Sequence, residues 1–223
     1  KIRKYDTWHA MGQGATTGSL VVTLEALKEM HLTPEDIQLI QNDTKTCPDT
    51  GMAGASRSLY MDGNATIIAA NKLLAAMRKE DGTLRTYDEM KAEGIETKYL
   101  GRYETNTTPG LCRLDPNTGI GDPTPAFTYC LNLAEVEVDT KTGKTTVLKF
   151  TCVDFVGRIG NIDAVNGQAY SGIMHGIGFA LKEDYADVKK HANMFGAGTS
   201  YIKDVPDDIN LIHIDGAISD APF

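Results

Sequence analysis

The tripeptide Gly12-Gln13-Gly14 stands directly before apolar residues that recur at helical spacing. The first backbone N–H groups of a helix lack intrahelical partners and carry a partial positive charge, so they bind anions such as phosphate. Glycine leaves room for such an anion, because a side chain at the helix start would hold it away. A GxG sequence is also common in plain turns, so the tripeptide favours either a phosphate cradle or an ordinary helix start.

Two further helix-forming stretches carry small residues. The first adds hydroxyl groups and a guanidinium, which suit phosphate, and comprises Ala53, Gly54, Ala55, Ser56, Arg57 and Ser58. The second contains four glycines, Gly167, Gly172, Gly176 and Gly178. By themselves, these four glycines favour close packing of a helix against a sheet. No cluster matches the Walker A or Rossmann pattern, which disfavours a generic nucleotide fold and leaves open a site for another phosphate-bearing cofactor.

The elements that must position these residues mix helices with strands. Helical spacing predicts helices from Ala15 to about His31 and over 59–77, 87–93 and 163–185. Alternating patterns predict strands near 1–10, 37–40, 96–105 and 207–215, and a hairpin of 126–139 with 144–156. Because hairpins and helices are mixed rather than arranged in strict βαβ order, the sequence predicts an α+β fold.

Composition excludes several classes of function. The net charge of −8 and the pI of about 5.1 disfavour binding to nucleic acid or to an anionic membrane. No apolar run approaches the roughly 20 residues of a membrane span, and no signal peptide is recognisable. Four scattered cysteines have no metal-ligand spacing, so we expect reduced thiols in a cytoplasmic protein. Both ends interrupt an element, which predicts a fragment of a longer protein.

Four segments occur in a fixed order: MGQGATTGSLVVTLEALK, NDTKTCPDTGMAGASRS, TPAFTYCLNLAEVEVDTKTGKTTV and VNGQAYSGIMHGIGFALKEDY. Together they resemble the molybdenum-binding part of the molybdenum hydroxylases, the xanthine dehydrogenase and aldehyde oxidoreductase family, and within it the bacterial aldehyde oxidoreductase type. The resemblance implies a molybdopterin cofactor with molybdenum, in its cytosine dinucleotide form. It implies that Gln13, between Gly12 and Gly14, lies beside the pterin, and that residues 53–58 wrap the pterin and phosphate. It places Gln168 and His175 in the same cofactor site.

The resemblance also implies a reaction and partners. The family hydroxylates a carbon next to oxygen or nitrogen, with oxygen from water, and passes electrons to iron–sulfur centres on other domains or subunits. Its catalytic glutamate is expected beyond Phe223, so no catalytic residue and no direct metal ligand is expected within residues 1–223. His175 stands where the family usually has glutamine. Either it is a neutral replacement or it brings a group that titrates near neutral pH.

The resemblance favours the C-terminal part of a cofactor-binding domain, with subdomains at about 1–110 and 111–223, inactive by itself. Its parent is expected to oxidise aldehydes to carboxylic acids and to form a homodimer. Hydroxylation of xanthine or another N-heterocycle is one alternative, and a non-catalytic cofactor-binding or assembly module is another. Asp154, at the end of an expected strand, is interpreted as a residue that caps or pairs locally.

Overall fold

The computed structural model describes residues 1–51, 53–54, 57–104, 114–121, 127–187 and 189–216 of the 223-residue chain. The chain divides into two compact units, Lys1–Phe127 and Thr128–Gly216. Each unit combines helices with a small sheet, which confirms the predicted α+β class. No helix among the described residues is both long enough and apolar enough to cross a membrane.

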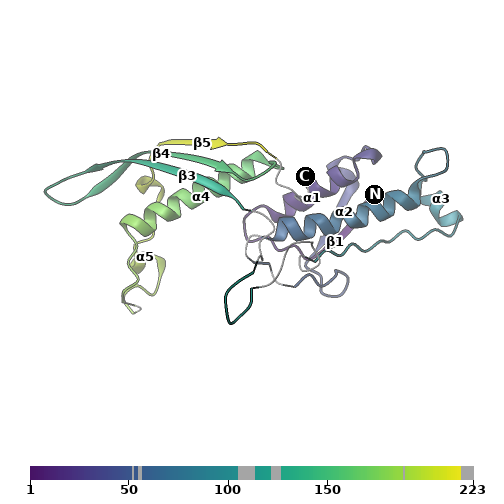
Figure 1. Ribbon diagram of the computed structural model, residues 1–223, viewed down its shortest axis with the longest axis horizontal. Helices are drawn as coiled ribbons and strands as arrows, with labels where there is room; N and C mark the ends of the chain where they lie inside the picture. Colours follow the sequence, from purple (N-terminus) through teal and green to yellow (C-terminus); the bar gives the residue numbers. More distant parts are fainter. Residues whose placement is uncertain (52, 55–56, 105–113, 122–126, 188, 217–223) are drawn as a thin grey trace. The chain divides into compact units, whose positions relative to one another are not determined.

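The first unit is built on a parallel pair of strands, β1 (Ile2–Asp6) and β2 (Ile37–Gln41). Helix α1 (Ala15–Ala26) connects them, and α2 (Ser58–Met77) packs against α1 (Figure 1). A shorter helix, α3 (Tyr87–Ala92), follows. Apolar side chains of these elements form one core, which comprises Leu27, Ala70 and Leu74 with Ile2, Ala26, Met30, Leu32, Leu73 and Leu84 around them.

Helix α1 is shorter than the sequence predicts. The α-helix ends at Ala26, a 3₁₀ turn covers Lys28–Met30, and His31 takes a left-handed φ of 50° that ends the helical run. The chain must reverse here to enter β2. Leu27 is nevertheless buried in the core. The apolar spacing that predicted a longer helix therefore arises because residues of the turn after α1 also contact the core.

The strand predicted over 96–105 is wrong for its described part, since residues 95–104 pair with no strand. This segment lies along α2 instead: Lys72 Nζ donates to the Leu100 carbonyl at 2.8 Å, and the Tyr60 and Tyr103 hydroxyls lie 3.0 Å apart. A Cβ on Gly101 would lie 1.8 Å from the Ala65 carbonyl oxygen. The alternating pattern therefore reflects contact with a helix rather than a place in a sheet.

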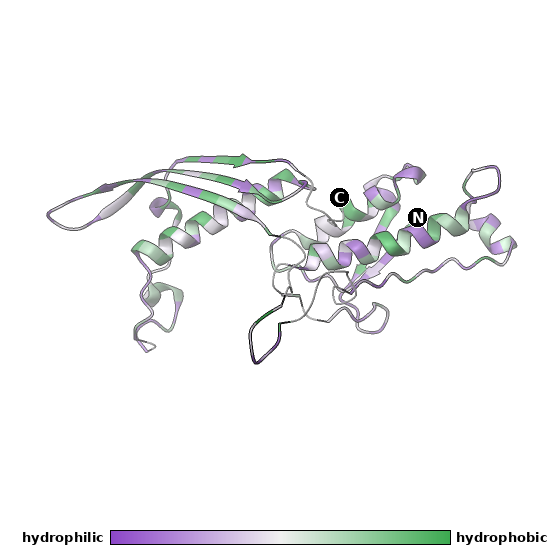
Figure 2. Cartoon of the chain, in the orientation of Figure 1, coloured by the Kyte–Doolittle hydropathy of each residue, from purple (hydrophilic) through white to green (hydrophobic). Residues whose placement is uncertain are grey.

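The second unit contains the predicted hairpin, β3 (Tyr129–Val138) with β4 (Thr145–Phe155), in antiparallel pairing with a register shift at Glu135/Val136. Strand β5 (Asp208–His213) pairs parallel with β4. Helix α4 (Ile162–Leu181) lies against one face of this sheet (Figure 1), where Ile173 and Ile177 pack on Cys152, and a short α5 (Met194–Ala197) follows. Hydrophobic and hydrophilic residues alternate along the strands (Figure 2), but all residues of β3 are exposed, and the core contacts of α4 are with β4 and β5.

Candidate functional site

The Gly12-Gln13-Gly14 loop lies between β1 and α1. Gly12 has φ +99° and Gly14 has φ +85°, a left-handed region that strains any residue with a Cβ. Gly14 is the N-cap of α1 and supplies no capping side chain, so the first N–H groups of α1 gain no bond from that residue. The backbone therefore requires both glycines, which the turn interpretation of the sequence also predicts.

The Gln13 side chain closes its own loop. Its Oε1 accepts from the Met11 N–H, and its Nε2 donates to the His9 carbonyl at 2.9 Å. The amide thus fixes the path from His9 to Gln13, and Gln13 is only half-buried. Sequence reasoning assigned Gln13 to the cofactor and did not detect this role in the loop.

The second loop follows β2 and leads into α2. Gly51 has φ +69°, whereas Gly54 does not have a left-handed φ. Arg57 is the N-cap of α2, and Ser58 is its first residue. Ala53 is half-buried. Of the six residues assigned to this loop from the sequence, Ala55 and Ser56 lie outside the described residues.

Parallel pairing brings the two loops to one edge of the sheet. Asp6 and Gln41 are the last residues of β1 and β2, and they are direct partners in the register. Both loops therefore leave the sheet at its carboxyl edge, where ligands bind in many parallel α/β sheets. Thr7 connects the two loops, because its Oγ1 donates to the Pro48 carbonyl at 3.0 Å and lies 2.5 Å from Thr50 Oγ1.

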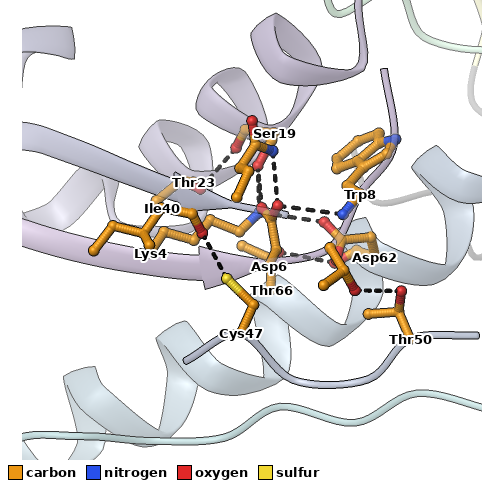
Figure 3. Close-up of polar contacts among 12 residues, drawn as sticks. Lys4, Asp6, Trp8, Ser19, Thr23, Ile40, Cys47, Thr50, Asp62 and Thr66 are labelled. Atoms are coloured by element: carbon orange, nitrogen blue, oxygen red, sulfur yellow. Dashed lines mark hydrogen bonds and ion pairs between the residues drawn. The ribbon is translucent and has the colours of Figure 1, made fainter. Parts of the chain in front are cut away.

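A buried polar cluster underlies this edge; we name it the Asp6 cluster, and it comprises Lys4, Asp6, Ser19 and Asp62 (Figure 3). Lys4 Nζ lies 3.1 Å from Asp6 Oδ2 and 3.3 Å from Asp62 Oδ2, and it donates to Ser19 Oγ at 2.7 Å. Burial raises the pKa of Asp62; the Lys4 ammonium opposes this shift, and the Asp6 carboxylate adds to it. One cation thus joins two carboxylates and a hydroxyl from β1, α1 and α2.

The remaining predicted site residues lie in the second unit. Gln168 and His175 are exposed on α4, and so are Gly172 and Gly176. Gly172, His175 and Gly176 follow Gln168 by four, seven and eight residues, which places all four on one side of the helix. The structure therefore groups the predicted residues into two sets: the two loops of the first unit and one helix face of the second.

Comparison with known proteins identifies the family. A family model described as a molybdopterin cofactor-binding domain matches residues 2–206. The chain belongs to this molybdopterin cofactor-binding family. Among curated relatives, an aldehyde oxidoreductase of Megalodesulfovibrio gigas is 40% identical over the whole chain, and a xanthine dehydrogenase of Dictyostelium discoideum is 26% identical over 95% of it. The chain covers 24% of the first and 16% of the second.

A solved structure agrees with this assignment. The aldehyde oxidoreductase of Desulfovibrio desulfuricans superposes with a TM-score of 0.93 at 43% identity, over 99% of this chain and 24% of that one. The predicted family and α+β class are confirmed, and so is the molybdenum cofactor as the cofactor of the family. The chain spans about a quarter of the length of these aldehyde oxidoreductases.

The space beside the glycines shows whether a molybdopterin cofactor could approach the backbone of this chain. A Cβ on Gly12, Gly51 or Gly54 would meet no described atom within 4 Å. Gly54 also lacks a left-handed φ, so neither conformation nor contacts within the described chain account for a glycine there. Free space beside the backbone is what a closely approaching cofactor requires. The first unit therefore leaves room for the group at these three glycines, as it also does at Gly82 in the turn between α2 and α3.

The glycines of α4 correct one interpretation of the sequence. A Cβ on Gly178 would lie 2.5 Å from Glu183 Oε1 and 2.8 Å from Ser200 Oγ, so close packing explains this residue. At Gly167, Gly172 and Gly176 a Cβ would meet no described atom within 4 Å. Packing against the sheet is therefore the wrong explanation for these three, because they are exposed and a Cβ at each would face open space.

Sequence reasoning missed a histidine of the second unit whose side chain is only 9% exposed. His213 Nδ1 lies 2.6 Å from Asp154 Oδ1, and its Nε2 lies 2.7 Å from Asn166 Oδ1, which joins β5, β4 and α4. Asp154 was expected to pair locally, but its partner is 59 residues away because β4 and β5 are parallel neighbours. The signal was available: His213 alternates with Ile209 and Leu211, which pack in the core of this unit.

Among the described residues, no group of three or more His, Cys, Asp or Glu side chains is arranged to hold a metal ion. Cys47, Cys130 and Cys152 are free thiols.

Proposed function

We propose that this chain forms part of the molybdenum-cofactor cradle of an enzyme that oxidises aldehydes to carboxylic acids with oxygen from water. The main support for the proposal is that two glycine-containing loops lie together at the carboxyl edge of β1 and β2. The space beside Gly12, Gly51 and Gly54 in these loops is free. The 40% identity to an aldehyde oxidoreductase over the whole chain supports the choice of substrate class.

The chain's own residues would bind and orient the cofactor. Backbone N–H groups at the starts of α1 and α2 would bind its phosphate, with the Arg57 guanidinium and the Ser58 hydroxyl beside them. Gln13, held by Met11 and His9, would keep Gly12 and Gly14 in their left-handed conformations beside the pterin. The bound molybdenum centre supplies the two-electron oxidation, and this chain supplies its position.

We also propose cofactor contacts for the exposed face of α4. Gln168 and His175 would donate hydrogen bonds there, and Gly172 and Gly176 would allow the close approach. We propose the cytosine dinucleotide form of the pterin, iron–sulfur centres on other domains or subunits, a cytoplasmic location and a homodimeric parent. We also propose that the catalytic glutamate lies outside residues 1–223.

The first test is the cofactor content of the intact protein purified without oxygen. We expect about one molybdenum and one pterin per chain by mass spectrometry and fluorescence, with cytidine monophosphate released by acid. Turnover of aldehydes faster than purines would support the substrate class. Folded protein that lacks both molybdenum and pterin, from a host that makes the cofactor, would contradict the proposal.

A matched pair of variants separates cofactor binding from backbone strain. Gly12→Ala and Gly82→Ala both place a Cβ at a left-handed residue in free space, φ +99° and +84°. Each should therefore lose about 1–2 kcal/mol of stability. Only Gly12→Ala should lose molybdenum, because Gly82 lies in the turn between α2 and α3. Equal molybdenum contents would count against a cradle at Gly12.

Two alternatives have different outcomes. Hydroxylation of xanthine or another N-heterocycle, favoured by relatives such as the 26% identical xanthine dehydrogenase, predicts a preference for purines over aldehydes. A non-catalytic module predicts bound cofactor with no turnover of either class.

A further inference from the structure

The Asp6 cluster places several polar and charged side chains in the interior of a small folded unit, where they lose their hydration. Asp6 and Ser19 are buried, and the Lys4 and Asp62 side chains are 10% and 13% exposed. Buried ion pairs stabilise a fold little better than apolar residues of similar volume, because each charge loses its hydration. Stability alone therefore gives a weak reason for these charges.

The contacts of Asp6 lead to both glycine loops. Its Oδ1 accepts from the Trp8 N–H at 3.3 Å, where the first loop begins, and from Gln41 Nε2 at 2.7 Å, where β2 passes into the second loop. Its Oδ2 accepts from Ser19 Oγ at 2.6 Å, in the second turn of α1 after Gly14. One carboxylate therefore bonds to both strand ends and to the helix that the first loop begins.

Lys4 extends the same connection to α2. Its ammonium bridges Asp6 and Asp62, and Asp62 lies one turn after Ser58, where the second loop ends. The Trp8 ring packs on α1, since a Cβ on Gly18 would lie 3.4 Å from it. Each loop therefore begins and ends close to a member of the Asp6 cluster or to a residue that is hydrogen-bonded to Asp6.

We propose that Asp6 is a positioning residue that holds the Gly12–Gly14 loop and the loop of residues 48–51 in place relative to each other, with Lys4 as its counter-charge. The inference rests on the proposed function, because the two loops are the two sides of the proposed cradle. Asp6 itself touches neither substrate nor cofactor and acts through Trp8, Gln41 and Ser19.

The test uses the intact protein without cofactor and the variant Asp6→Asn, which keeps the size and removes the charge. Hydrogen exchange is measured in peptides covering 9–14, 48–51 and, as an internal reference, the centre of α2 around Ala70. We expect exchange in both loop peptides to rise about tenfold, as for a lost hydrogen bond to a charged group, with the reference unchanged. Loaded protein should retain less molybdenum after gel filtration.

Asp81→Asn is the matched control. Asp81 is an exposed aspartate that bonds to Thr83 in a turn away from the loops, so neither loop peptide should change. If Asp6→Asn does not fold, Gln41→Met removes one bond to Asp6 and should raise exchange mainly in the 48–51 peptide.

Loops that exchange as in the wild type would overturn the inference, and so would a rise that includes the reference peptide to the same extent. Because exchange is measured without cofactor, it reports loop positioning even if the wild-type protein binds no molybdenum, which would overturn the proposed function instead.

Discussion

Replacing Gly172 with alanine should change stability and cofactor binding in opposite directions. Gly172 lies within α4, has no left-handed φ, and would place its Cβ in free space among the described residues. Alanine in a helix interior is about 1 kcal/mol more favourable than glycine. With no clash to offset this gain, the second unit should become more stable by about that amount.

Function should respond differently if the α4 face meets the cofactor. A methyl group on Gly172 would then occupy the space that the cofactor needs beside Gln168 and His175. The loaded variant should contain less molybdenum than the wild type, although its helix is more stable. The need for space beside the cofactor would then explain why position 172 is glycine, although alanine would make the helix about 1 kcal/mol more stable.

Gly178→Ala is the control in the same helix. Its Cβ would lie 2.5 Å from Glu183 Oε1 and 2.8 Å from the buried Ser200 Oγ, so neighbours must shift. Both atoms are the ends of side chains, so their shift has a modest cost that offsets part of the helical gain of about 1 kcal/mol. Gly178→Ala should therefore be less stable than Gly172→Ala.

The assay is hydrogen exchange of the α4 amides in the cofactor-free intact protein, together with molybdenum content in the loaded form. An increase of about 1 kcal/mol corresponds to roughly fivefold slower exchange. If Gly172→Ala slows exchange and leaves the molybdenum content unchanged, the α4 face does not approach the cofactor. Faster exchange would refute the reasoning about the helix itself.

Two further predictions concern the first unit. Leu27→Ala should lower the free energy of unfolding by about 2–5 kcal/mol, because Leu27 is buried in the core with Ala70 and Leu74, and denaturant unfolding would measure the loss. Bonds from Lys79 and from Thr86 lower the pKa of Glu89 to about 2, so its contribution to holding α3 is present above about pH 4.5 and disappears as the pH falls toward 2. Glu89→Gln should flatten the pH dependence of proteolysis in α3 over that range, and an unchanged profile would contradict this role.

Local sequence patterns determined most of the elements. Apolar spacing located α1, α2 and α4, and turn residues between alternating runs located the β3–β4 hairpin. The sequence also predicted a turn at the glycines of the first loop, because the left-handed conformations of Gly12 and Gly14 depend on neighbouring residues. These features depend on residues within a few positions of each other, and a linear sequence contains that information directly.

Only the tertiary structure decided which distant residues meet. The parallel register of β1 and β2 brings the loops after Asp6 and Gln41 to one edge, and the register of β4 and β5 pairs Asp154 with His213. The 96–104 segment alternates like a strand but lies along α2. Periodicity shows which side of a segment is buried and not what buries it. Which partner buries a segment depends on pairing between segments far apart in the chain. The free energy that favours one pairing over another is a property of the whole fold.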